Sequence, residues 1–221
     1  MSVFLLETHA HTAEVSSCGN LYSNQVIDSY IDEGYDAIVI TDHFHLHFFK
    51  RNSHLNYKEQ VDKYLSGYRA AKAYAGNKMK VFLGLEISLD GDPNDYLIFG
   101  VEEEFLHKNK NLCSLDIKHL SDLVRENNYL LVQAHPFRKN MRIVNPSLLD
   151  GIEVYNGNSG HNSSNNIAKA WAQEYNLIET SGTDFHYYFR MKPGGILFKN
   201  PINTNAELVK ALRSREYSLR L

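Results

Sequence analysis

Short apolar runs alternate with segments of helical periodicity along most of this chain. Seven runs have the length and the apolar content of buried β-strands. They cover residues 3–6, 37–40, 80–85, 96–99, 130–132, 151–155 and 177–179. Because strands that alternate with helices are typical of βα units, the pattern predicts a mainly parallel sheet in a barrel-like α/β domain.

The segments between the runs carry the apolar stripes of amphipathic helices. In segment 24–33 the stripe extends from Val26 to Ile31, and Gly34 follows where a left-handed helix cap is expected. A longer helix is expected over 57–75, where aromatic and aliphatic residues recur at helical spacing. Further helices are expected over 114–127, 166–175 and 206–213.

Composition and charge narrow the class of protein. The 221 residues carry a formal net charge of only -3, which indicates neither a nucleic-acid-binding surface nor a membrane anchor. The two cysteines, Cys18 and Cys113, cannot form the disulfide framework of a small secreted domain. No apolar run has the length of a signal-peptide core or a membrane span. We therefore expect a single cytoplasmic domain over residues 1–221 with no membrane partner.

Histidine and acidic side chains gather around the ends of the expected strands. His9 and His11 follow the first run, and Asp184 and His186 follow the last. The strands between them are accompanied by Asp42, His43, Glu86, Asp95, His135 and Glu153. Because the C-terminal ends of parallel strands share one rim of an α/β barrel, these side chains should converge there.

Two of these strand ends carry paired polar side chains at alternate positions. In His9-x-His11 and in Asp184-x-His186 both members point to the same side, since strand side chains alternate with a period of two. Imidazole and carboxylate ligands together suit Zn, Mn or Fe. A single pair also occurs among histidines that only form hydrogen bonds, whereas the two pairs together predict a divalent metal centre.

Six short strings connect these residues to a known family. They are T-H-A-H-T at 8–12, I-T-D-H at 40–43, G-L-E at 84–86, Q-A-H-P at 133–136, G-I-E-V-Y-N at 151–156 and S-G-T-D-F-H at 181–186. Their order and spacing resemble the motifs of the PHP (polymerase and histidinol phosphatase) superfamily over almost the whole chain. The resemblance implies a distorted seven-stranded (β/α) barrel that holds two or three divalent metal ions and hydrolyses phosphoesters.

The resemblance also implies a set of metal ligands. The first metal ion would be held by His9, His11, Glu86 and Asp184. Glu86 would bridge to a second ion that His135 also holds, and a third ion would be held by His43 and His186.

Two positions depart from the motifs of the family. Asp95 lies where the family commonly has a histidine, and it is either a carboxylate ligand or a strand-edge residue in water. In the S-C-G string at 17–19, Cys18 replaces the usual aspartate. We expect Glu14, three residues past His11, to supply the missing ligand, because a hard oxygen suits a phosphoesterase site. A thiolate from Cys18 is the alternative.

The expected reaction is hydrolysis of a small phosphate ester by a hydroxide that bridges the metal ions. Histidinol phosphate, a nucleotide, a short oligonucleotide and a sugar phosphate are all open as substrates. Arg138 is expected to bind the phosphate and to act in catalysis with Asp184 and His186. Asn156 and His45 are the other expected substrate contacts, and the segment between Phe44 and Tyr57 should overhang the rim.

Two other function classes stay open on the sequence alone. An amidohydrolase-like enzyme would use the same barrel and the same metal chemistry on a C–N bond, since sequence does not fix the electrophile. A non-catalytic binding module would be expected to have lost metal ligands, whereas nearly all of them remain here. The sequence leaves the oligomeric state open.

Overall fold

The computed structural model describes residues 3–186 and 192–221. The strands are β1 Phe4–Ala10, β2 Ala37–Ile40, β3 His43–Phe44, β4 Lys80–Ser88, β5 Asp95–Phe99, β6 Leu130–Gln133, β7 Gly151–Asn156, β8 Ile178–Gly182, β9 Ile196–Phe198 and β10 Tyr217–Leu219. The α-helices are α1 Ser23–Asp32, α2 Leu46–Arg51, α3 Tyr57–Tyr64, α4 Ser66–Ala75, α5 Glu103–Lys108, α6 Ile117–Glu126, α7 Asn165–Glu174 and α8 Asn205–Ser214. Two short 3-10 turns cover Leu112–Ser114 and Pro146–Leu148.

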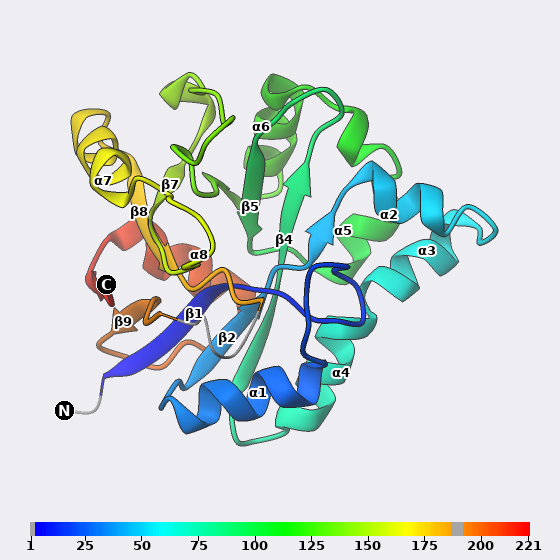
Figure 1. The fold of residues 1–221 in the computed structure, drawn as a ribbon, viewed down its shortest axis with the longest axis horizontal. Coiled ribbons are helices and arrows are strands. Elements are labelled where there is room, and N and C mark those ends of the chain that lie inside the picture. The colour runs from blue at the N-terminus through cyan, green and yellow to red at the C-terminus, as the bar shows by residue number, and fades with distance from the viewer. Residues whose placement is uncertain (1–2, 187–191) are drawn as a thin grey trace.

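The sheet curls into a nearly closed barrel. Its strand order is β10-β9-β1-β2-β4-β5-β6-β7-β8, with β3 paired to β4. The last strand of this order, β8, returns to β1 (Figure 1), since the Thr8 hydroxyl donates to the Ser181 carbonyl at 2.8 Å and Ala10 forms a parallel bridge with Phe185. This confirms the predicted α/β barrel. Within the described residues, the short strands β3, β9 and β10 add to the seven that the sequence predicts.

Strand β5 runs against its neighbours. It pairs antiparallel with β4 and with β6, and Asp95 at its start lies opposite Ser88 near the end of β4. The start of β5 therefore reaches the same rim as the C-terminal ends of β4 and β6. The other pairings among β1, β2, β4, β6, β7 and β8 are parallel, as the alternating pattern predicts.

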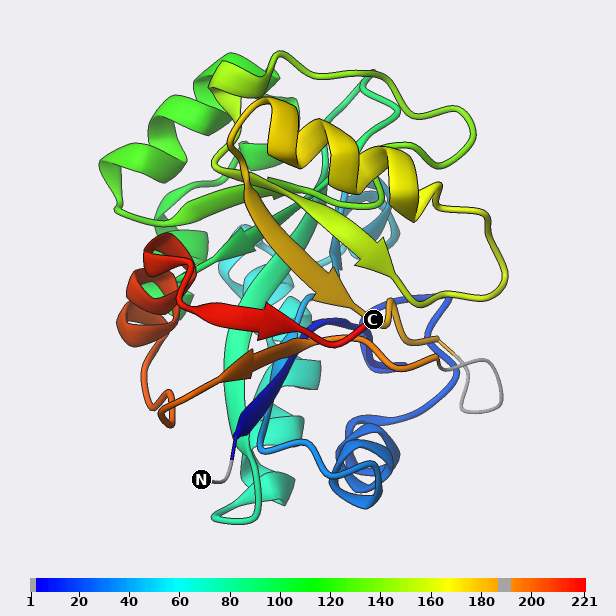
Figure 2. The same cartoon turned by 90° about the vertical axis from the view of Figure 1, so that its left-hand side faces the viewer.

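Helices cover the outside of the barrel. Helices α1 and α4 lie together beside β2 and β4, and α7 covers β7 and β8 (Figures 1 and 2). Figure 2 also shows β10, β9 and β1 side by side, as their antiparallel pairing requires. Within the described residues, no helix is both long enough and apolar enough to cross a membrane.

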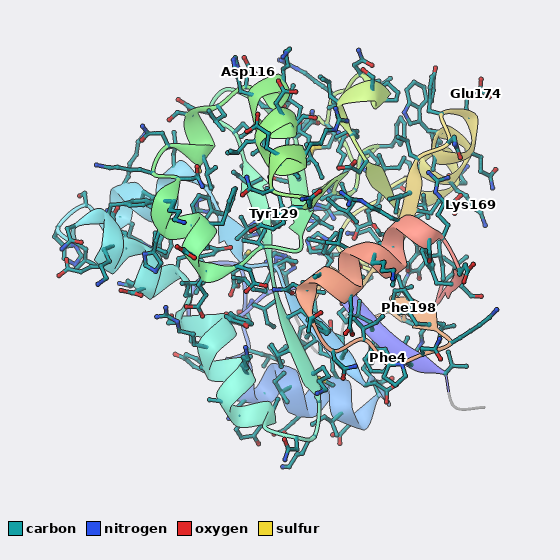
Figure 3. All side chains as sticks on the ribbon, turned by 180° about the vertical axis from the view of Figure 1, so that it is seen from behind. Phe4, Asp116, Tyr129, Lys169, Glu174 and Phe198 are labelled. Atoms are coloured by element: carbon teal, nitrogen blue, oxygen red, sulfur yellow. The ribbon has the colours of Figure 1, made fainter. Side chains whose placement is uncertain are left out.

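The buried side chains of alternate strand positions form two apolar layers. One layer lies between the sheet and the outer helices. The other joins strand residues such as Phe82, Leu97 and Val132 to Leu208 and Leu212 of α8. Figure 3 shows α8 from behind, next to the labelled Phe4 and Phe198. Along β4, Phe82 and Glu86 share a face because they are four positions apart, so this inner surface changes from apolar to charged toward the rim.

Two helical segments differ from the sequence prediction. The single helix expected over 57–75 bends at Leu65 into α3 and α4. The bend keeps both helices in contact with the rim, since the Tyr64 hydroxyl donates to the Asp42 carbonyl and Gly67 packs on Thr12. The segment between Phe44 and Tyr57, expected to overhang the rim, contains the short helix α2. It packs onto α3, since Phe44 and Phe48 contact the Tyr64 ring and are each only 1% exposed.

Candidate metal centre

Glu86 lies at the centre of the converging side chains. Its Oε1 is 3.0 Å from His135 Nε2 and 3.2 Å from His9 Nε2. Its Oε2 is 2.7 Å from His43 Nδ1 and 3.4 Å from His11 Nε2. One buried carboxylate thus faces four imidazoles, two with each oxygen, which is the arrangement of a carboxylate that bridges two cations.

Asp184 provides the second carboxylate of the cluster. Its Oδ1 is 3.6 Å from His9 Nε2 and 3.4 Å from His11 Nε2. Its Oδ2 accepts a hydrogen bond from Arg138 Nη2 at 2.6 Å. Asp184 and Glu86 therefore lie on either side of the His9-x-His11 pair that extends from the end of β1.

The donor atoms fall into groups that are close enough to hold metal ions. Within each group the ligand atoms lie within 4.8 Å of one another. The groups found among the described residues are His11, His43 and His186; His9, Glu86 and His135; and His9, His11 and Asp184. The structure thus brings together seven of the residues that the sequence predicts as metal ligands.

Unpaired polar atoms support a cation at this position. His9 Nε2 and His11 Nε2 are buried and have no hydrogen-bond partner, although both point at carboxylate oxygens. Buried polar atoms are normally satisfied, and an exception requires an explanation such as a bound ion. Neutral imidazole nitrogen and carboxylate oxygen are ligands for Zn, Mn and Fe. The residues present therefore fit a cluster of divalent cations.

Burial and neighbouring charges shift the pKa values of the histidines in the cluster. Burial alone would lower the pKa of His9, but the carboxylates of Glu153 and Glu86 hold that pKa well above its usual range. The pKa of His11 is held well below its usual range, first by burial and then by the charges of His43 and His186. Cations that bind here would compete with protons for these imidazoles.

Hydrogen bonds to Glu153 fix the positions of His9 and His135. Its Oε1 is 2.9 Å from His9 Nδ1, so His9 presents its Nε2 to Glu86 and Asp184. Its Oε2 accepts hydrogen bonds from His135 N at 2.9 Å and from Asn156 Nδ2 at 2.8 Å. A carboxylate that fixes a ligand imidazole in this way is typical of metal sites.

Backbone strain and close packing occur at the same ligands. His135 and Asp184 have positive φ angles of 29° and 51°. Positive φ is costly for residues other than glycine and tends to occur at functional sites. Gly182, just before this strained turn, allows β8 to approach β1, since a Cβ there would lie 2.5 Å from His9 Cβ and 3.0 Å from Glu153 Oε1.

Glu7 and Asp42 hold the rim together, although sequence analysis gives neither a role. Glu7 Oε1 accepts from the backbone N–H groups of Thr8, His9 and Thr183, at 2.9, 2.7 and 2.9 Å. Asp42 accepts from Thr12 N at 2.7 Å and from the hydroxyls of Thr12 and Ser16 at 2.6 Å each. Burial raises the pKa of Glu7 to about 7 and that of Asp42 to about 6. Asp42 belongs to the I-T-D-H string, whereas the only sequence signal for Glu7 is an acid directly after an apolar run.

The two candidates for the missing family aspartate lie in different surroundings. The Glu14 carboxylate is outside the cluster and accepts from Ser23 N at 3.0 Å and from the Ser23 hydroxyl at 2.7 Å, at the start of α1. Cys18 Sγ lies 3.1 Å from His186 Nε2. Burial would raise the pKa of this thiol, but hydrogen bonds with His186 and His43 outweigh burial and lower it to about 6. The structure therefore brings Cys18, and not Glu14, to the cluster.

Asp95 and His45 lie at the edge of the cluster. Asp95 Oδ2 is 4.0 Å from His135 Nε2, while Oδ1 accepts from the Ser88 hydroxyl. His45 Nδ1 accepts from Phe48 N at 3.0 Å at the start of α2, and its ring centroid is 5.8 Å from that of His43. Asp95 is close enough to approach a cation beside His135, whereas His45 lines the rim next to His43.

Arg138 and Asn156 join the cluster through Asp184. Arg138 Nη2 donates to Asp184 Oδ2 at 2.6 Å and to Asn156 Oδ1 at 3.2 Å. Asn156 Nδ2 in turn lies 3.2 Å from Asp184 Oδ2. The guanidinium is thus beside a ligand carboxylate, and its side chain is only 15% exposed. Asn156 is 5% exposed and serves this hydrogen-bond network.

Comparison with known proteins identifies the fold family. A family model described as PHP domain matches residues 7–210. The chain belongs to the PHP domain family. This confirms the family that the sequence strings resemble. Comparison with curated proteins finds no match.

Solved structures share the fold of this PHP domain at low sequence identity. A two-domain protein from Bacteroides vulgatus, which contains a predicted PHP-like metal-dependent phosphoesterase, has a TM-score of 0.71 at 17% identity, covering 99% of this chain and 64% of that one. A lesion-specific endonuclease from Pyrococcus furiosus has a TM-score of 0.64 at 15% identity, covering 99% and 58%. An amidohydrolase from Chromobacterium violaceum has a TM-score of 0.59 at 14% identity, covering 95% and 96%. The chain thus spans less than two thirds of the first two proteins.

Proposed function

We propose that this PHP domain is a metal-dependent phosphoesterase that hydrolyses a small phosphate ester of the histidinol phosphate, nucleotide or sugar phosphate type. The observation that carries the proposal is Glu86, whose two oxygens face His9, His11, His43 and His135 inside a buried cluster. Such a cluster fits two or three ions of Mn, Zn or Fe. Membership of the PHP family and the fold shared with a predicted phosphoesterase support the same chemistry.

Different residues of the cluster would hold the cations and bind the phosphate. Bound divalent ions would supply an activated water and neutralise the charge that develops on phosphoryl oxygens. Glu86 and Asp184 would hold the cations together with His9, and Glu153 keeps the His9 ring in the orientation that binding needs. A covalent nucleophile from the protein is not required by this chemistry.

Arg138 is positioned to orient the phosphate. Its guanidinium lies against Asp184, so a phosphoryl group that engages it would also lie beside the metal ligands. Guanidinium donors match phosphate oxygens in a fixed planar geometry. His45 lies on the rim near His43 and would contact the remainder of the substrate.

An amidohydrolase function is the second candidate. The fold is shared with the amidohydrolase from Chromobacterium violaceum, and a divalent metal centre can also polarise a carbonyl for cleavage of a C–N bond. The fold is also shared with an endonuclease, so an oligonucleotide is a further candidate for the phosphoester substrate.

A substrate panel separates these candidates. The metal-loaded protein would be assayed on phosphomonoesters, phosphodiesters and cyclic amides, with the Glu86→Gln variant as the control for contaminating hydrolases. We expect hydrolysis of phosphoesters that the variant lacks, because Glu86 contacts four of the expected ligands. Hydrolysis of amides alone would instead establish the amidohydrolase function.

A further inference from the structure

Three imidazoles and one thiol meet on the side of the cluster away from Glu153. The ring of His11 lies between those of His43 and His186, with centroid distances of 4.4 and 4.5 Å. Their nitrogens form one of the groups close enough to hold a cation. Cys18 Sγ lies 3.1 Å from His186 Nε2.

We propose that the thiolate of Cys18, with His43 and His186, holds a cation and makes this subsite selective for zinc over harder ions. The proposal rests on the proposed function only in requiring that the cluster binds divalent metals. Three protein ligands leave a fourth tetrahedral position open, as in catalytic zinc sites. Thiolate is a soft ligand that favours zinc, whereas the carboxylate usual at this position in the family suits manganese equally well.

The buried nitrogen of His11 supports a cation in or next to this subsite. His11 is 1% exposed, and its Nε2 has no hydrogen-bond partner. Its Nδ1 is 3.4 Å from the Ser16 hydroxyl, so the unpaired nitrogen is the one that faces the cluster. His11 belongs to two groups of donor atoms, one with His43 and His186 and one with His9 and Asp184, so a cation in either group accounts for an uncompensated acceptor in a fully buried position.

Backbone hydrogen bonds fix the loop that carries Cys18. Gly19 N donates to Ser16 O at 3.0 Å, and Asn20 N donates to His186 O at 3.2 Å. The second bond joins the loop to the residue whose ring contacts the thiol. Cys18 is thus held at the cluster by the same contacts that position His186.

The other candidates on the chain are already engaged elsewhere. Both oxygens of Glu14 lie within hydrogen-bonding distance of Ser23 N at the start of α1. Cys113 is 3% exposed and donates its thiol to the Phe44 carbonyl. Cys113 is a structural thiol and therefore a matched control for Cys18.

Cobalt substitution tests the thiolate directly, without an activity assay. Co²⁺ in the wild-type protein should show the intense near-ultraviolet band of thiolate-to-cobalt charge transfer. The Cys18→Ser variant should lose this band and one zinc equivalent per chain by elemental analysis, while Cys113→Ser should keep both. Cys18→Asp should recover the equivalent, without the band and with a higher affinity for Mn²⁺ relative to Zn²⁺.

The outcomes separate this inference from the proposed function. A charge-transfer band and a zinc content that are the same in wild type and Cys18→Ser would overturn the thiolate ligand while leaving a metal-binding cluster. A wild-type protein that binds neither cobalt nor zinc would overturn both. Circular dichroism of each variant establishes that the fold is retained, and Cys18→Asp provides a second test if Cys18→Ser does not fold.

Discussion

Arg138 lies between the proposed metal centre and the proposed phosphate site. Its guanidinium pairs with Asp184 at 2.6 Å, and it is only partly exposed. A charge-assisted pair of this kind is stronger than a neutral hydrogen bond, and a phosphate would compete for the same donors. The side chain is therefore expected to affect substrate recognition more than cation affinity.

Replacement of Arg138 tests this division. Arg138→Ala should lower kcat/KM for a phosphoester by about 10- to 100-fold, which corresponds to the loss of one charged hydrogen-bonding group. Metal content should be unchanged, because guanidinium binds anions. Steady-state kinetics and elemental analysis measure the two quantities. The neighbouring exposed Lys139→Ala is the control, and equal effects of the two substitutions would remove the specific role of Arg138.

Glu14 illustrates a residue whose role depends on the path of a loop. Its carboxylate accepts a hydrogen bond from Ser23 N, one of the backbone donors at the start of α1 that have no partner within the helix. Glu14→Gln should therefore lower the free energy of unfolding by about 1 kcal/mol, through loss of a favourable charge at a helix N-terminus. Denaturant unfolding measures this change. The metal content should remain that of the wild type.

An acid at the opposite end of α1 is the matched control for Glu14. Glu33 lies at the C-cap of α1, where a negative charge is unfavourable, so Glu33→Gln should not lower stability. A loss of bound metal in Glu14→Gln would return Glu14 to the set of ligands expected from the sequence.

The convergence of the side chains of the cluster could be predicted from the sequence because they belong to short strings at strand ends. His9 is the next-to-last residue of β1, His11 follows the end of β1 by one residue, and His135 follows the end of β6 by two. The position of Glu14 could not be predicted in this way, since three residues of separation from His11 do not determine which way the loop turns. The hydrogen bond to Ser23 depends on where α1 packs.

At the level of elements, the direction of β5 decides whether Asp95 can take part in the site. Asp95 precedes its strand in the sequence, so a parallel β5 would place it at the opposite end of the barrel. The antiparallel pairings bring it opposite Ser88, next to the rim that His135 occupies. Strand direction depends on pairing partners distant in sequence, and the local apolar pattern is the same in either direction.

Helix α4 is held close to the rim by Gly67. A Cβ at this position would lie 2.1 Å from Thr12 Oγ1 and 2.7 Å from Asp42 Oδ2. Thr12 cannot rotate away without losing its hydrogen bond to Asp42. The sequence does not reveal this contact, because it depends on how a helix and a loop from different parts of the chain pack together.

Gly67→Ala sets two effects against each other. Alanine improves helix propensity by about 1 kcal/mol, whereas overpacking of a tight contact costs about 1–3 kcal/mol. We expect overpacking to dominate and the free energy of unfolding to fall, as measured by denaturant titration. In a Thr12→Ala background the same substitution should cost less, with a coupling above about 0.5 kcal/mol. A stabilising effect in the wild-type background would show that the close contact relaxes freely.

For the whole molecule, the barrel separates an apolar inner layer from a charged rim. Phe82 and Glu86 on the same face of β4 mark this change over four residues. The seven predicted strands and the family strings were sufficient to indicate a barrel with metal ligands at one end. Closure through β1 and β8, and the short strands β9 and β10, depend on pairings between distant segments that single-sequence periodicity does not contain.

The most direct test is hydrolysis of an aryl phosphate as a function of the metal bound per chain. Protein stripped with a chelator would be reloaded stepwise with Mn²⁺ or Zn²⁺, and the rate and metal content measured on the same samples. We expect no hydrolysis at zero equivalents and a rate that rises with bound metal, because buried His9, His11, Glu86 and Asp184 form a site suited to cations. Full activity in the metal-free protein would contradict a metal-dependent phosphoesterase.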